Sequence, residues 1–229
     1  MHCLPVEMFG LPKTPTTAAG TELGHYQVVG KVGAGGFGCV YKAWDPLLER
    51  FVAIKTCESG APETRHRFAR ETRLAGSLNH PNIVTIFDCQ LEGDVLFLVQ
   101  EFLDGEDLDA TIRRGEPPRL ADKLRILDEI CAGLCHAHAR GVVHRDIKPA
   151  NVRIPTTGLA KIMDFGIARS VGDDVEITEP GRMVGSAGYM APEQIQGGPI
   201  DQRTDLISGQ IMGSDHGFRC LGARLRAAR

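Results

Sequence analysis

The chain has 229 residues, of which 42% are hydrophobic and 24% charged, and its formal net charge is −3 at pH 7. This length and apolar content are sufficient for one large domain or two small lobes with a buried core. The small negative charge gives no electrostatic case for nucleic-acid binding. No apolar run reaches the roughly 18 residues that a membrane helix needs, so we predict no membrane segment.

Residues 1–24 contain Pro, Thr and Gly without periodicity, which predicts a flexible leader. They have no basic start followed by a long apolar stretch, so we predict no secretion signal. The seven cysteines form no Cys-x-x-Cys pair, which favours the reduced thiols of a cytoplasmic protein. Cys131 and Cys135 lie near several histidines. They also fall in a helical pattern with Leu124 and Leu134, so we expect both cysteines to be buried rather than to bind zinc.

The chain beyond residue 25 predicts a β-rich part followed by a helical part. Runs of β-branched and aromatic residues, separated by Gly or Asp-Pro, predict strands at 26–33, 39–45, 50–58, 83–90 and 95–103. A helix is expected at 63–78, with Phe68, Leu74 and Leu78 as candidate inward positions. A long amphipathic helix at 120–141 ends at Gly141. This order predicts two lobes, and a ligand commonly binds between lobes.

The string Gly33-Ala34-Gly35-Gly36-Phe37-Gly38 matches the pattern GxGxxG, which dinucleotide-binding folds also contain. In those folds a helix follows the glycines and holds the pyrophosphate, whereas two β-rich runs follow here. This context argues against a dinucleotide-dependent oxidoreductase. It favours a hairpin in which backbone N–H groups approach phosphates.

Lys55 ends the run Val52-Ala53-Ile54-Lys55, in which strand alternation places Ala53 and Lys55 on one face. An exposed surface lysine is the simpler interpretation. Glu71, a carboxylate on the following predicted helix, favours the functional one because it would hold Lys55 in an ion pair. Residues 144–151, HRDIKPAN, add a carboxylate, an ammonium, a guanidinium, an imidazole and an amide within one short loop.

The sequence resembles that of a eukaryotic-type serine/threonine protein kinase, and is most similar to bacterial members, because seven motifs of this family occur in the family's order. They are GAGGFGCVYKA, VAIK, RETRLAGSLNHPNIV, LVQEFLDGEDL, HRDIKPAN, DFG at 164–166, and GYMAPEQ. The resemblance implies an α+β, two-lobe protein kinase fold within residues 25–208. A β-rich N-lobe with one main helix would span 25–100, a hinge 101–105 and an incomplete helical C-lobe 106–208.

The resemblance implies transfer of the γ-phosphoryl group of ATP, with Mg²⁺, to Ser or Thr hydroxyls of a protein substrate. Asp146 would be the catalytic base, and Lys148 would offset charge on the transferring group. Asn151 and Asp164 would supply oxygen ligands to Mg²⁺. Lys55, paired with Glu71, would contact the α- and β-phosphates. The implied nucleotide-binding set is Val32, Gly33, Gly35, Gly36, Gly38, Val40, Ala53, Lys55, and the backbone at Glu101 and Leu103, with Gln100 behind the pocket.

The resemblance also implies supporting roles in the helical part. His144 would pack near Phe165, and Asp205 would bond the backbone around His144 and Arg145. A phosphate near Arg145 would order the activation segment at 164–193. Thr178 is the first candidate for that phosphate, ahead of Ser170 and Ser186, and an ordinary loop hydroxyl at Thr178 is the equal alternative.

Two positions and one segment depart from the family pattern. Arg153 stands where an apolar residue usually lies under the adenine ring, although its aliphatic stem would still pack there. Ala75 stands where a larger residue is common. After Asp205, Gly209 and Gly213 predict a broken helix, and 209–229 is expected to be a divergent, poorly ordered tail, which suggests truncation or a frame change. The alternative to an active kinase is therefore a catalytically impaired, kinase-like nucleotide-binding or interaction module.

Overall fold

The computed structural model describes residues 21–35, 38–58, 72–92, 95–114, 119–156, 158–165 and 187–215. The chain divides into two compact units. One comprises Met1–Arg65 and Ile86–Phe102, and the other comprises His66–Thr85 and Leu103–Arg229. The chain therefore passes between units within the predicted hinge, but residues 66–85, which the sequence assigned to the N-lobe, group with the second unit.

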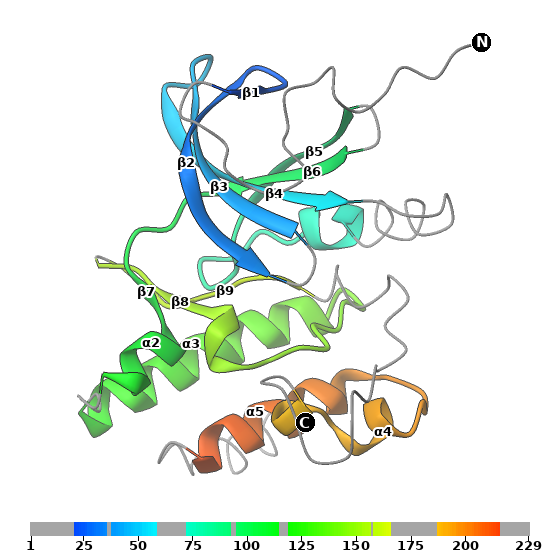
Figure 1. The fold of residues 1–229 in the computed structure, drawn as a ribbon. Coiled ribbons are helices and arrows are strands. Elements are labelled where there is room, and N and C mark those ends of the chain that lie inside the picture. The colour runs from blue at the N-terminus through cyan, green and yellow to red at the C-terminus, as the bar shows by residue number, and fades with distance from the viewer. Residues whose placement is uncertain are drawn as a thin grey trace. The chain divides into compact units, whose positions relative to one another are not determined.

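The first unit contains a six-stranded antiparallel sheet with the strand order β1-β2-β3-β4-β6-β5 (Figure 1). Strands were predicted in five places, and each prediction overlaps an observed strand or its beginning. The prediction at 83–90 began too early, because β5 starts at Ile86. The strands are β1 (Glu22–Leu23), β2 (Tyr26–Gly35), β3 (Gly38–Asp45), β4 (Arg50–Glu58), β5 (Ile86–Glu92) and β6 (Val95–Glu101).

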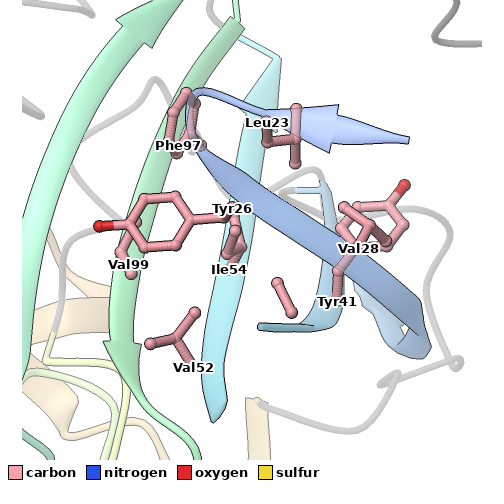
Figure 2. Packing of buried hydrophobic residues seen from close by; sticks show 9 residues of the cluster. Leu23, Tyr26, Val28, Tyr41, Val52, Ile54, Phe97 and Val99 are labelled. Atoms are coloured by element: carbon pink, nitrogen blue, oxygen red, sulfur yellow. The ribbon is translucent and has the colours of Figure 1, made fainter. Parts of the chain in front are cut away.

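One face of this sheet carries the apolar core of the first unit. Since successive strand residues point to opposite faces, alternate positions of β3, β4 and β6 supply this core. Figure 2 shows the side chains from β2, β4 and β6 gathered together. The buried cluster consists of Leu23, Tyr26, Val28, Tyr41, Ala43, Val52, Ile54, Phe97 and Val99.

The turn between β3 and β4 is organised by Asp45, whose residue surface is only 1% exposed. Its Oδ1 atom accepts hydrogen bonds from the backbone N–H groups of Leu47 and Leu48, at 3.1 and 3.2 Å. Arg50 Nε lies 3.6 Å from the other carboxylate oxygen. An Asp that bonds the backbone two and three residues later is a common means of fixing a turn. Asp45 therefore sets the β3–β4 register.

The second unit is mainly helical, with a small antiparallel sheet in the order β7-β8-β9. Residues 72–76 also form a helical stretch. The elements are β7 (Glu106–Asp107), α2 (Leu108–Arg113), α3 (Leu120–His138), η2 (Pro149–Asn151), β8 (Val152–Ile154), β9 (Lys161–Ile162), η3 (Ala187–Tyr189), α4 (Pro192–Ile195) and α5 (Gln202–Asp215). Along the part of the chain described here, no helix is long and apolar enough to cross a membrane.

Helix α3 buries one stripe of side chains. The sequence pattern predicted that Leu124 and Cys135 belong to this stripe, and both predictions were wrong. Leu124 is 42% exposed and Cys135 is exposed, while Cys131 is half-buried. At 100° per residue these three positions share a stripe beside the buried one. The buried stripe consists of Ile126, Leu127, Glu129, Ile130, Gly133, Leu134 and Ala137.

Two further sequence expectations about helices need correction. In the stretch 72–78, Leu78 is buried as predicted, but Leu74 is 46% exposed because Thr72 and Ala75 form the buried side instead. Helix α5 runs from Gln202 to Asp215 without the break predicted at the two glycines. A glycine inside a helix costs about 1 kcal/mol relative to Ala, which lowers stability without ending the helix. The predicted inward position Phe68 lies outside the described residues.

Candidate active site

The second face of the first unit's sheet carries the residues that the sequence assigned to nucleotide binding. Val40 is directly opposite Lys55, and Ala53 is directly opposite Gln100. Directly opposed residues of antiparallel strands share a face, and alternation places Ala53 and Lys55 on the same one. Ala53 and Gln100 are buried, while Val40 and Lys55 are half-buried. Four predicted residues therefore meet on the face opposite the apolar core.

The glycine string lies in the hairpin formed by β2 and β3, as its sequence context predicted. Gly33 pairs with Val40, and Gly35 pairs with Gly38, which has a φ of 135°. A side chain at that φ would be strained, so the position favours glycine. A Cβ atom at Gly33 would meet no atom within 4 Å, and Val32 is 56% exposed. Gly36 lies outside the described residues.

The ion pair predicted between Lys55 and Glu71 involves a residue outside the described part of the chain. Lys55 itself is held in β4. The same holds for the activation-segment candidates, because Ser170, Thr178 and Ser186 all fall within residues 166–186. These expectations stay predictions.

In the loop 144–151, the predicted catalytic residue Asp146 contacts both the predicted catalytic residue Lys148 and the predicted magnesium ligand Asn151. Lys148 Nζ lies 2.7 Å from Asp146 Oδ2. Asn151 Nδ2 donates to the same carboxylate oxygen at 3.0 Å and to the Asp146 carbonyl oxygen at 2.8 Å. These contacts hold the carboxylate in one orientation.

His144 fixes the loop to the residues that precede and include Phe165. Its side chain is fully buried, and Nε2 lies 2.7 Å from the carbonyl oxygen of Met163. Since Nδ1 accepts from the backbone N–H of Asp146 at 3.2 Å, Nε2 carries the proton and donates it to Met163. The centroids of the His144 and Phe165 rings are 4.7 Å apart, which confirms their predicted contact.

A buried carboxylate from α5 anchors the start of the same loop. Asp205 is fully buried and accepts hydrogen bonds from the backbone N–H groups of His144 and Arg145, at 2.8 and 2.7 Å. The predicted contact of Asp205 is therefore confirmed. His138 Nε2 also lies 2.7 Å from Asp205, and Gln194 Nε2 donates to the Arg145 carbonyl oxygen at 2.7 Å.

A backbone hydrogen bond brings the chain segments of the two predicted magnesium ligands, Asn151 and Asp164, together. Met163 donates from its N–H to the carbonyl oxygen of Asn151 at 2.9 Å, so Asp164 directly follows a residue bonded to Asn151. Asp164 has a φ of 54°. Because Asn151 uses Nδ2 for Asp146, its Oδ1 atom stays available as an acceptor. A carboxylate and a carbonyl-type oxygen fit Mg²⁺, which usually takes one or two protein ligands beside phosphate oxygens and water.

A second buried carboxylate that supports this region was not predicted from the sequence. Glu129, on α3, is 9% exposed. Its Oε2 atom accepts from the backbone N–H of Ala160 at 2.7 Å, and Oε1 pairs with Arg125 Nη1 at 2.7 Å. Ala160 immediately precedes β9, so Glu129 fixes the turn that leads to Met163 and Asp164. A partner 31 residues away leaves no local pattern by which to predict it.

Three relatives show which proteins this chain resembles. It is 39% identical over 188 residues to Serine/threonine-protein kinase PrkC of Bacillus subtilis, a match that covers 81% of this chain and 29% of that protein. It is 35% identical over 190 residues to Serine/threonine-protein kinase PknB of Mycobacterium leprae, covering 80% and 30%. It is 38% identical over 201 residues to Serine/threonine-protein kinase PknA of Mycobacterium tuberculosis, covering 84% and 46%. The chain thus spans less than half the length of each.

The sequence profile of the protein kinase domain matches residues 26–213. That range includes the glycine hairpin, Lys55, the loop 144–151, Asp164 and Asp205. The match extends into α5 beyond Gly209, where the sequence alone predicted divergence. The chain therefore belongs to the protein kinase domain family.

Proposed function

We propose that the chain is an ATP- and Mg²⁺-dependent serine/threonine protein kinase that acts in the cytoplasm. The observation that carries this proposal is the contact of both Lys148 and Asn151 with the carboxylate of Asp146. The names of the relatives support the substrate class, because all three are serine/threonine-protein kinases. The absence of a Cys-x-x-Cys pair among the seven cysteines of the sequence agrees with a reducing compartment.

In the proposed reaction, Asp146 accepts the proton of the substrate hydroxyl while the hydroxyl oxygen forms a bond to the γ-phosphorus of ATP. The bond between that phosphorus and the β,γ-bridging oxygen breaks, and ADP leaves with the electron pair. Lys148, already beside Asp146, offsets negative charge on the transferring group. Lys55 neutralises the other phosphates with Glu71 as its partner, and the backbone of the glycine hairpin covers them. Asn151 and Asp164 are the residues that would hold Mg²⁺, which would supply positive charge to the phosphate oxygens when bound.

The adenine site is proposed on the first unit's second sheet face. Val40 and Ala53 supply apolar contact, and Gln100 lies beside Ala53 in the strand register. The backbone groups of Glu101 and Leu103 would bond the adenine edge. Such a site acts mainly by holding the reacting groups in position and by stabilising charge.

The test is incorporation of radiolabelled phosphate from ATP into a basic protein substrate by the full chain. Asp146→Ala should lower the rate by about 10²–10⁴-fold, as expected for loss of a general base. Asp122→Ala, which removes an exposed carboxylate of α3, is the matched control and should leave the rate unchanged. Equal rates for both variants would contradict the proposal. A nucleotide-induced thermal shift without incorporation would instead support the binding-module alternative.

A further inference from the structure

The ammonium group of Lys42 lies against two aromatic rings in the first unit. Its Nζ atom is 4.1 Å from the centroid of the Phe51 ring and 4.4 Å from that of Phe102. The two ring centroids are 6.4 Å apart with an interplanar angle of 56°. Both distances are within the roughly 6 Å at which a cation is attracted to the face of an aromatic ring. We call Lys42, Phe51 and Phe102 the cation–aromatic stack.

The strand register places this stack beside the proposed adenine site. Lys42 is directly opposite Ala53, and Val40, two residues earlier in β3, is directly opposite Lys55. Opposed residues share a face, so Lys42 lies on the same face as Val40, Ala53 and Lys55. It is therefore the next residue along β3 on the face to which nucleotide binding is assigned.

The stack also includes the residue that follows the end of β6. Phe102 directly follows Glu101, the last residue of β6, and precedes Leu103. These are the two residues whose backbone groups are proposed to bond the adenine edge. Because Phe102 lies between them, a contact that restricts Phe102 also restricts both neighbouring peptide groups. The stack thus links β3 and β4 to the backbone segment that would recognise adenine.

An ordinary surface lysine would not adopt this arrangement without a compensating gain. Ordering a lysine side chain costs up to about 2 kcal/mol of rotamer entropy. Among the described residues, no carboxylate pairs with Lys42 Nζ. The two aromatic rings therefore provide the interaction that orders it.

We propose that Lys42 is a positioning residue for the nucleotide, acting through Phe102 on the backbone at Glu101 and Leu103. This inference rests on the proposed kinase function. Lys42 touches neither the phosphates nor the reacting atoms in this assignment, so its loss should weaken nucleotide binding without slowing the chemical step. Such a separation distinguishes it from Lys55, whose loss should affect both.

The test compares three variants of the full chain by titration with Mg·ADP and by steady-state kinetics. Lys42→Met keeps an unbranched side chain but removes the charge, and should weaken Mg·ADP binding and raise the KM for ATP about fivefold, with kcat within about twofold. Lys42→Arg should bind nearly as the parent, because a guanidinium also stacks on aromatic faces. Lys31→Met removes the charge of an exposed lysine from β2 and should change neither constant.

A second variant keeps the test valid if Lys42→Met does not fold. Phe51 is 44% exposed, so Phe51→Leu should fold, and it should weaken Mg·ADP binding in the same direction. Unchanged binding by Lys42→Met, or equal weakening by Lys31→Met, would overturn the assignment while the kinase proposal stands. If the parent chain itself binds no Mg·ADP, the kinase proposal fails and this assignment fails with it.

Discussion

The buried carboxylate of Asp205 accepts a 2.7 Å hydrogen bond from the backbone N–H of Arg145, 60 residues earlier in the chain. Arg145 has a φ of 69°, in the left-handed region. A residue other than glycine in that region costs on the order of 1–3 kcal/mol. The charged acceptor offsets this cost because bonds from N–H groups to a carboxylate are stronger than those to a neutral acceptor. The conformation before Asp146 therefore depends on Asp205.

Replacement of Asp205 should destabilise the second unit and disable its loop. Asp205→Ala leaves the buried N–H groups of His144 and Arg145 without their acceptor. We expect a loss of about 3 kcal/mol in the free energy of unfolding, since each unsatisfied buried donor costs roughly 1–3 kcal/mol. Urea denaturation followed by circular dichroism measures it. The control Asp122→Ala should stay within about 0.5 kcal/mol of the parent, and a similar value for both variants would show that Asp205 is not an anchor.

Replacement of Asn151 should change the magnesium dependence of phosphoryl transfer. Asn151→Ala removes one proposed oxygen ligand and one donor to Asp146. We expect the Mg²⁺ concentration for half-maximal rate to rise about tenfold or more, and chelation with EDTA should stop incorporation entirely. Asn79→Ala, at an exposed position of the same unit, is the control. An identical Mg²⁺ titration for Asn151→Ala and the parent would remove Asn151 from the proposed ligand set.

Replacing Gly133 with Ala should lower the stability of the chain, although Ala has the higher helix propensity. A Cβ atom there would lie 2.9 Å from Ile162 Cδ1 and 3.1 Å from the backbone oxygen of Asn82. Overpacking of this kind costs about 1–3 kcal/mol, against a gain of about 1 kcal/mol in helix propensity. Gly133→Ala should therefore lower the thermal midpoint.

Gly198→Ala provides the comparison for Gly133, because its Cβ would meet Glu193 at 3.5 Å, an ordinary contact. We expect Gly198→Ala to leave the midpoint near that of the parent. If Gly133→Ala raised the midpoint, helix propensity would outweigh packing at this position. The close approach of α3 to β9 would then be less rigid than the structure indicates.

The pair formed by His80 and His136 should make the stability of the second unit depend on pH. The centroids of the two imidazole rings are 4.9 Å apart. Burial and the nearby Arg140 lower the pKa of His80 below 6.5, and burial, Arg140 and His80 together lower the pKa of His136. Both Nδ1 atoms act as acceptors, from Asn82 N–H and from Arg140 Nη1. The neutral form of each imidazole is therefore the one that fits the fold.

The direction of the effect follows from proton binding. A histidine with a lowered pKa in the folded state binds protons more readily when unfolded, so its stabilisation is complete above the unfolded pKa and declines as the pH falls below about 6.5. The thermal midpoint should decrease as the pH is lowered from about 7.5 to 5.5. The double variant His80→Gln/His136→Gln should reduce this dependence, and Arg140→Gln should reduce it less. An equally steep pH profile for the double variant would exclude this pair as its source.

The sequence predicted those parts of the site that depend on neighbouring residues. The hairpin context of the glycines, the shared face of Ala53 and Lys55, and the loop 144–151 all follow from local order. The contacts of His144 with Phe165 and of Asp205 with the loop came from family resemblance, since no local pattern joins residues so far apart.

The failed predictions share one physical reason. Leu74, Leu124 and Cys135 are apolar or weakly polar residues at the edge of a helical stripe, where periodicity alone does not say which side is covered. Glu129 and Lys42 would pass as ordinary surface charges in the sequence. Each is placed by a partner from another element, Ala160 for Glu129 and Phe102 for Lys42. Gly209 was predicted to break a helix, but α5 continues through it, because a helix can contain a glycine at some cost in stability.

The distance in sequence between Arg145 and Asp205 has a consequence for synthesis on the ribosome. The loop 144–151 leaves the ribosome with every reactive group it will carry, but the carboxylate that sets its backbone follows about 60 residues later. Chains fold from the amino terminus as they emerge, at about 5–20 residues per second, so a growing chain passes several seconds with this loop unanchored. A chaperone or protease that recognises unfolded backbone would meet its target during that interval, and would lose it once Asp205 arrives.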